Sequence, residues 1–412
     1  MTDQLTGRAD GRGNGHRDRD DDTEHEVDAE PVVDATDAAD VVAAPEADAE
    51  VEPAAATPAG PPAPQATQAP APAEGTNGRD SHLDNVKFVA ITLVVVGHAW
   101  GPMLAWSRSL EAAYLFLYTV HMPIFVTLSG YFSRHFTASP RQARSLVRSV
   151  VVPYLIIESA FTLYRHFGAG QDLEFALHDP WWITWFLATL FFWRLSSPVW
   201  RVVRFPIVIA VVVSLAAGSA ELTGALELGR MLQYLPFFVI GLSLRREHFA
   251  WLRTLWVRLA AVPILAGAIY GAYVLAPHVS VEWVYWRQGN EALGVSYPIF
   301  ALVKIAQLAA TVLVLLAVIS LVPGRRLPVI TGFGAASMYA YLLHGFAAKG
   351  AEWWDVYDLP FVHTHAGIVV VTLAAVVLTL VLCSPPVRVL FSWAVQPKLE
   401  GWLRGPTDRS LS

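Results

Sequence analysis

Ten apolar stretches, separated by short polar connections, follow one another between residues 86 and 384. Each is close to the roughly 20 predominantly apolar residues that a helix needs to cross a bilayer. We therefore expect an all-α fold, a polytopic membrane bundle of about ten transmembrane helices. The predicted helices cover residues 86–106, 112–132, 149–167, 181–197, 204–220, 230–246, 255–276, 297–322, 332–348 and 364–384.

Basic residues mark one side of the predicted bundle. With the N-terminus placed in the cytoplasm, the cytoplasmic stretches hold Arg134, Arg141, Arg144, Arg148, Arg201, Arg204, Arg245, Arg246, Arg253, Arg258, Arg325, Arg326, Arg388, Lys398, Arg404 and Arg409. The opposite side holds an acidic loop at 171–179 and the tryptophans of an expected aromatic belt, Trp181, Trp182, Trp283, Trp286, Trp353 and Trp354. Because cytoplasmic loops carry an excess of Lys and Arg, we predict a multi-pass protein of the cell membrane with both termini cytoplasmic.

Charge and composition set the first 80 residues apart. They hold 19 acidic and 5 basic side chains and no Phe, Trp or Tyr, whereas residues 81–412 hold 16 acidic and 24 basic side chains. Such a segment cannot bury enough apolar surface to offset the entropy lost on ordering. We predict a disordered acidic, Ala/Pro-rich cytoplasmic tail at 1–80, a transmembrane domain at 81–390 and a cytoplasmic C-terminal tail at 391–412. A docking arm and a plain solvating extension are both open for residues 1–80, and composition favours the extension.

The first predicted helix carries two ionisable residues, Lys87 and His98. They are eleven residues apart, close to three helical turns, so both face the same way with a rise of about 16 Å between them. Lys87 then lies at the cytoplasmic boundary and His98 near the midplane, at a depth similar to that of His121 on the next helix. Ionisable groups inside a bilayer are costly and commonly functional. For Lys87 the plainer alternative is a side chain that snorkels to the headgroups.

Further polar residues lie within the later apolar segments. Glu158 is deep in the third, Arg230 opens the sixth, and Ser337, Tyr341 and His344 form one stripe on the ninth. A lone histidine or serine can be ordinary packing between helices, and Arg230 can be an interfacial anchor, but a buried carboxylate needs a proton or a partner. The set as a whole favours function. The catalytic candidates are His98, Lys87, His121 and Glu158, and the substrate-binding candidates are Arg230, Ser337, Tyr341 and His344; we expect no metal ion.

Several chemistries lack support in the sequence. It contains no G-x-S-x-G or H-E-x-x-H motif, no P-loop and no dinucleotide fingerprint. The single cysteine, Cys383, excludes an intramolecular disulfide and a cysteine zinc cluster. A histidine with a near-neutral pKa can remove a proton from a hydroxyl, and the cytoplasmic basic residues can hold a phosphorylated donor. The residues alone therefore leave open a membrane enzyme or a transporter with a histidine-centred polar core.

Five segments follow one another in a characteristic order: residues 84–98 (DNVKFVAITLVVVGH), 121–131 (HMPIFVTLSGY), 185–187 (WFL), 230–241 (RMLQYLPFFVIG) and 337–344 (SMYAYLLH). In this order they resemble the acyltransferase 3 family, the integral membrane O-acyltransferases, and the D-N-x-K opening resembles its fucose 4-O-acetylase-like branch. The family's mark is a basic residue, ten residues, then histidine. The resemblance covers roughly residues 80–390.

The resemblance implies transfer of an acyl group, usually acetyl, from acyl-CoA to a hydroxyl of an envelope glycan, glycolipid or related acceptor. His98 takes the place of the family's catalytic histidine. Lys87 stands where most members have arginine, and lysine cannot make the bidentate contact of arginine with a phosphate. Acyl-CoA would be a co-substrate, with no permanently bound cofactor.

Two other functions are compatible with the same residues. A transporter or flippase for an envelope lipid or polysaccharide would use the polar core as a path, and a scaffold would recruit partners through the acidic tail. The expected partners are acyl-CoA, a glycan or lipid-linked acceptor and the lipid bilayer, and we expect no nucleic acid.

Overall fold

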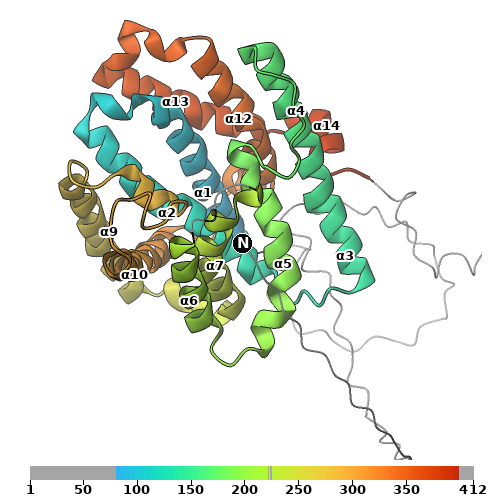
Figure 1. The fold of residues 1–412 in the computed structure, drawn as a ribbon, viewed down its shortest axis with the longest axis vertical. Helices are drawn as coiled ribbons and strands as arrows, with labels where there is room; N and C mark the ends of the chain where they lie inside the picture. Colours follow the sequence, from blue (N-terminus) through green and yellow to red (C-terminus); the bar gives the residue numbers. More distant parts are fainter. Residues whose placement is uncertain (1–79, 221, 223–224, 399–412) are drawn as a thin grey trace, which may run out of the picture. The chain divides into compact units, whose positions relative to one another are not determined.

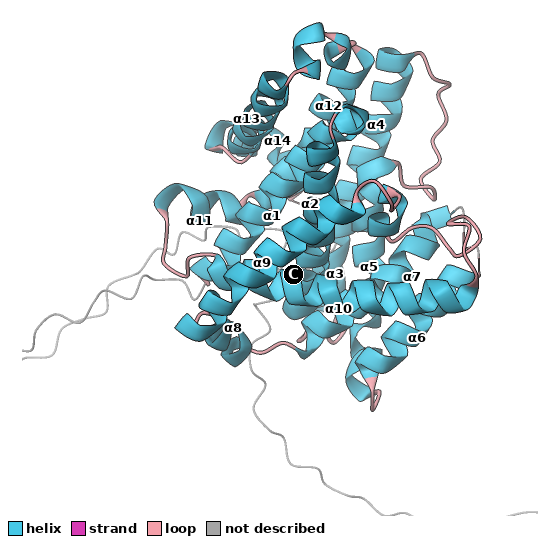
Figure 2. Ribbon diagram, turned by 90° about the vertical axis from the view of Figure 1, so that its left-hand side faces the viewer, coloured by secondary structure: helices cyan, strands magenta, loops and turns pink. Residues whose placement is uncertain are grey.

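The computed structural model describes residues 80–398 apart from 221, 223 and 224. Across these residues every regular element is a helix and none is a strand, as Figure 2 shows with helices in cyan. The all-α prediction is therefore confirmed. Residues 1–79 of the predicted acidic tail, and residues 399–412 of the predicted C-terminal tail, lie outside the described residues.

Each of the ten predicted apolar segments coincides with a helix. These are α1 (Ser81–Trp100), α2 (Arg108–Phe132), α4 (Val152–Ala169), α5 (Trp185–Val202), α6 (Pro206–Ser219), α7 (Leu228–Ser243), α9 (Leu255–Leu275), α10 (Tyr297–Leu321), α12 (Ser337–Trp353) and α13 (His365–Leu382). Within the described residues, six helical segments are long and apolar enough to cross a membrane, those that contain α1, α2, α4, α9, α10 and α13. Helices α6, α7 and α12 are shorter, at 14, 16 and 17 residues.

Four shorter helices, which the apolar pattern does not predict, join these segments. They are α3 (Pro140–Leu146), α8 (Arg246–Leu252), α11 (Pro328–Ala335) and α14 (Pro385–Val395). Three of them carry proline in the first turn, where the missing N–H leaves no hydrogen bond unmade. The predicted boundary at residue 390 falls inside α14.

The outer surface of the bundle is apolar along α9 and α13. Leu259, Val262 and Ile269 of α9 are more than half exposed, as are Leu373 and Val377 of α13. A large apolar outer surface on helices of spanning length suits lipid tails rather than water. The chain is therefore a multi-pass membrane protein.

Helices α2 and α7 cross at very close range, which brings their polar side chains into one core. A methyl group on Gly241 would lie 2.0 Å from the carbonyl oxygen of Thr127, and one on Gly130 would lie 2.0 Å from that of Phe238. Glycine is therefore needed on both sides of the crossing, as at other small-residue contacts in membranes.

Helix α1 contacts α2, α11, α12 and α13, all of which are labelled in Figure 2 and all but α11 in Figure 1. Its first turn is fixed by Asn85, whose amide donates to the carbonyls of Pro323 and Arg325 at 2.7 and 3.0 Å and accepts from Thr331. This anchoring sets the register of α1, and with it the height of His98.

The arginine-rich connections meet at the end of the bundle where α1 begins, which we call the arginine end. Arg201 donates to the backbone carbonyls of Arg134 and Phe136, and Arg253 packs against Gly324. Residues of the connections after α4 and α9 line a common pocket at the opposite end, which we call the loop end, and the connection after α9 also lines a cavity with His98 of the last turn of α1.

Candidate active site

Two predicted residues, His98 and His344, form a hydrogen-bonded pair in the core. His98 Nδ1 lies 2.7 Å from His344 Nε2, and the two rings stack with centroids 5.0 Å apart. His98 comes from the last turn of α1 and His344 from the middle of α12. The pair therefore joins residues that are 246 positions apart in the chain.

The backbone of α12 fixes the direction of this hydrogen bond. His344 Nδ1 lies 2.9 Å from the carbonyl oxygen of Ala340 and 2.7 Å from that of Tyr341. A carbonyl oxygen can only accept, so His344 Nδ1 carries a hydrogen, and in the neutral ring Nε2 is then an acceptor. His98 must donate from Nδ1, which leaves the lone pair of His98 Nε2 free to accept a proton.

The third histidine, His121 of α2, also hydrogen-bonds through Nδ1 to a backbone carbonyl of its own helix. Its Nδ1 lies 2.9 Å from the carbonyl oxygen of Leu117, one turn earlier, and its ring packs edge-on against Tyr118. Nε2 of a neutral His121 is therefore an acceptor as well. Gly97 beside His98 makes room for Leu117, because a methyl group there would lie 2.7 Å from the Leu117 side chain.

His98 and His121 line a cavity of about 240 Å³, which we call the histidine cavity. Of the other predicted site residues, Arg230 and Tyr341 also line it. The sequence did not single out its remaining polar groups, which are Tyr114, Tyr118, Tyr234, Tyr285, Glu282 and Arg287. The cavity therefore combines bare histidine nitrogens with hydroxyl and guanidinium donors.

Charge in the histidine cavity is partly balanced by Glu227. This carboxylate lies 3.0 Å from Arg287 and 3.8 Å from Arg230, whose guanidinium also stacks over the ring of Trp185 at 4.8 Å. Arg230 Nε is buried and has no hydrogen-bond partner within the described part of the chain. Because this nitrogen is buried beside Glu227, Arg230 contributes to the cavity through the charge of its guanidinium group, which lines it.

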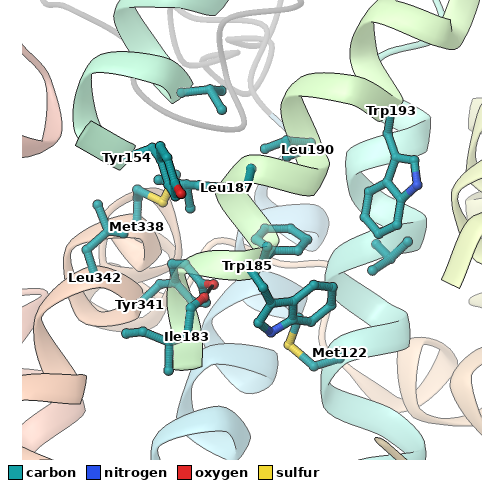
Figure 3. Close-up of a cluster of buried hydrophobic side chains, with 14 of the residues drawn as sticks. Met122, Tyr154, Ile183, Trp185, Leu187, Leu190, Trp193, Met338, Tyr341 and Leu342 are labelled. Carbon is teal, nitrogen blue, oxygen red and sulfur yellow. Dashed lines mark hydrogen bonds between the residues drawn. The ribbon is translucent and has the colours of Figure 1, made fainter. Parts of the chain in front are cut away.

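The turn before α5 closes one side of the cavity. The ring of Trp182 lies 4.6 Å from that of His98, and Tyr341 donates its hydroxyl hydrogen to the carbonyl of Ile183. Figure 3 shows Tyr341 beside Ile183, and Trp185 beside Met122 to the right of that pair. Trp182 has φ +49°, a left-handed conformation that is rare for a bulky residue.

Glu158 of α4 contacts the same turn, residues 181–184, through hydrogen bonds. Its carboxylate accepts hydrogen bonds from the Trp181 backbone N–H at 3.0 Å and from the Thr184 hydroxyl. It is buried and is not among the residues that line the histidine cavity. The structure thus brings Glu158 to the site as a support for Trp182 rather than as a group that faces the cavity.

Lys87 and Ser337 lie closer to the arginine end than Tyr341 does. The three residues line a narrow slit with a volume of about 20 Å³, which has room for about one water. Lys87 Nζ is 2.7 Å from a carboxylate oxygen of Asp84 and lies over the ring of Phe132. Its side chain is only 4% exposed. The snorkelling alternative is therefore wrong for Lys87, because a buried ion pair holds the ammonium inside the bundle.

The prediction of an interfacial aromatic belt is wrong for two of its six tryptophans, Trp182 and Trp286. Trp286 is 1% exposed and packs against Tyr234 and Phe237, and Trp182 lines the histidine cavity. Among the described residues, no group of three or more His, Cys, Asp or Glu side chains could hold a metal ion.

Comparison with known proteins gives one extended match. The model of a family described as "Acyltransferase domain" matches residues 80–384. The curated protein "Nodulation protein NolL" of Mesorhizobium japonicum is 37% identical over 62 residues, which cover 14% of this chain and 17% of that protein. No solved structure matches the chain.

Proposed function

Because the chain belongs to this family of membrane acyltransferases, we propose that it moves an acetyl group from acetyl-CoA to a hydroxyl of an envelope glycan or glycolipid. His98 is the general base in this proposal. The observation that carries it is the chain of hydrogen bonds from the Ala340 and Tyr341 carbonyls through His344 to His98. This chain leaves the lone pair of His98 Nε2 free, on a side chain that lines a cavity with hydroxyl and guanidinium groups.

The proposed reaction is a direct attack. The acceptor oxygen gives its hydrogen to His98 Nε2 as it bonds to the thioester carbonyl carbon, and the carbon–sulfur bond then breaks. The CoA thiolate leaves with that proton, which restores neutral His98. While His98 is an imidazolium, its Nδ1–H donates to His344 in a stronger, charge-assisted bond.

The developing oxyanion needs a donor, and three predicted residues lie close enough to compete for this role. The hydroxyl hydrogen of Tyr341 is already given to Ile183, and neutral His121 presents a bare Nε2. Arg230 lines the cavity with a cationic guanidinium group that carries five N–H donors, and its ion pair with Glu227 is long at 3.8 Å. We therefore assign oxyanion stabilisation to Arg230.

Acetyl-CoA approaches from the arginine end in this proposal, which places that end and both termini in the cytoplasm. The arginines offer bidentate partners for the donor phosphates, while Lys87 is already paired with Asp84. The slit between Lys87 and Tyr341 leads toward the histidine cavity, since Tyr341 lines both. The slit must widen before the thioester can pass.

The test is release of CoA thiol from acetyl-CoA by purified protein, with and without added glycan acceptor. His98→Ala should lower the rate by about 10²- to 10⁴-fold, the usual contribution of a general base. The matched control is His278→Ala, since His278 is exposed on the loop after α9. Substantial activity in a monodisperse, folded His98→Ala protein would exclude His98 as the base, and transport without any thiol release would favour the transporter alternative.

A further inference from the structure

A second and larger cavity opens beside the histidine cavity at the loop end. Its volume is about 580 Å³, within the range of small-molecule sites. We call it the loop pocket. It shares Trp182, Arg230 and Arg287 with the histidine cavity, so the two are neighbours across these three side chains.

Charges of both signs line the loop pocket in nearly equal number. Its carboxylates are Asp172, Glu174, Asp179 and Glu227, and its guanidinium groups are Arg165, Arg230 and Arg287. Arg230 and Arg287 both pair with Glu227. A phosphate or other anion would therefore meet several carboxylates and few free cations, which makes an anionic ligand unfavourable.

A neutral, hydroxyl-rich ligand suits the same lining. A hydroxyl both donates and accepts, so it can donate to a carboxylate while accepting from a guanidinium. Trp181 and Trp182 add partly buried aromatic surface to one wall, and aromatic rings pack well on the apolar C–H surface of a ligand ring. This combination of groups is the chemistry that recognises a sugar.

The position of the pocket gives that sugar a route to the base. Trp182 lines the loop pocket and packs against His98 with ring centroids 4.6 Å apart. The predicted donor path through the Lys87 slit reaches the histidine cavity at Tyr341, from the arginine side. A ligand in the loop pocket would therefore reach His98 without crossing that path.

We propose that the loop pocket binds a neutral sugar ring of the acceptor and presents one of its hydroxyls, past Trp182, to His98 Nε2. This inference rests on the proposed acetyl transfer and deepens it by assigning the acceptor to the loop pocket and by specifying an uncharged sugar ring. Asp179 and Glu174 act as hydroxyl acceptors in the pocket. Trp182 forms the boundary between sugar and thioester.

The experiment uses the full-length protein in detergent, [¹⁴C]acetyl-CoA and a panel of soluble methyl glycosides. The panel contains neutral hexosides and deoxyhexosides, the anionic methyl glucuronide, and glycerol as a ringless alcohol. Labelled product and thiol release are measured together. We expect label on neutral glycosides, with little on the glucuronide or on glycerol.

The matched variants separate the pocket from the general surface. The double variant Glu174→Gln/Asp179→Asn should raise the half-saturating concentration of the neutral glycoside about tenfold, because it removes two charged acceptors. Asp355→Asn is the control, since Asp355 is an exposed acidic residue of the connection after α12 and does not line the pocket.

Each outcome bears on one of the two proposals. Thiol release that depends on His98, with no label on any neutral glycoside, overturns the sugar site and leaves acetyl transfer standing. Preferential labelling of the glucuronide or of glycerol, or equal half-saturation in wild type and the double variant, also overturns it. Absence of thiol release under every condition overturns the proposed function itself.

Discussion

Replacing His344 with phenylalanine tests the histidine pair directly. The change keeps an aromatic ring on α12 but removes the Nε2 acceptor that lies 2.7 Å from His98 Nδ1. His98 can then carry its hydrogen on either nitrogen. The tautomer with hydrogen on Nε2 cannot accept a proton from the acceptor hydroxyl.

The size of the effect follows from the bond that is lost. A hydrogen bond between neutral groups contributes about 0.5–1.5 kcal/mol, and one that involves a charged group about 1.5–3 kcal/mol. The bond between His98 and His344 changes from the first kind to the second as His98 takes its proton. With the loss of tautomer control added, we expect the transfer rate at saturating substrate to fall about 10- to 100-fold.

The assay is initial-rate thiol release with saturating acetyl-CoA and acceptor. His344→Gln, whose amide oxygen can accept from His98, should recover part of the lost rate, and His278→Ala should match wild type. Equal rates for folded wild-type and His344→Phe proteins would refute the tautomer argument. A His344→Gln variant as slow as His344→Phe would show that the ring, rather than its acceptor nitrogen, matters.

Two further changes test the support of the site. Glu158→Ala removes the acceptor for the Trp181 N–H and the Thr184 hydroxyl. Each buried donor left without a partner costs about 1–3 kcal/mol, so we expect a lower unfolding temperature and slower transfer. Glu158→Gln, which keeps an acceptor oxygen, should be intermediate, and a wild-type unfolding temperature in Glu158→Ala would contradict this role. Gly241→Ala would place a methyl group 2.0 Å from the Thr127 carbonyl oxygen, so it should destabilise the protein by about 1–3 kcal/mol or more. The control is Gly267→Ala on α9, where an added methyl group would have no atom within 4 Å. This control should unfold at the wild-type temperature in the same thermal unfolding assay.

The helices could be predicted from the sequence because bilayer thickness fixes the length of an apolar segment. The short helices α3, α8, α11 and α14 were missed, since none is long enough to stand out as an apolar run of spanning length. For α11, the proline at residue 328 was an available signal of a helix start. The pairing of Lys87 with Asp84 was also visible, because the two residues are three positions apart on one helix.

The contacts of the site could not be predicted in the same way. Sequence spacing gives the depth of His98 and of His344, but it does not show which helices are neighbours, and the pair spans 246 positions. The tyrosines of the histidine cavity other than Tyr341 were missed for the same reason. Trp182 and Trp286 were assigned to an interfacial belt because position along a helix does not distinguish a lipid-facing side from a core-facing one.

Two buried groups, the Glu158 carboxylate and the Tyr341 hydroxyl, both hold one strained turn beside the histidine cavity. A non-glycine residue in a left-handed conformation costs about 1–3 kcal/mol and persists only where its surroundings fix it; here Glu158 holds the turn from α4 and Tyr341 holds it from α12. Because the Glu158 carboxylate accepts hydrogen bonds from Trp181 and Thr184, it does not contact the imidazole of His98, whose Nδ1 partner is His344 instead. In the proposed reaction, proton transfer therefore falls to a pair of histidines, and the Glu158 carboxylate contributes by holding the turn that carries Trp182, whose ring lies 4.6 Å from that of His98.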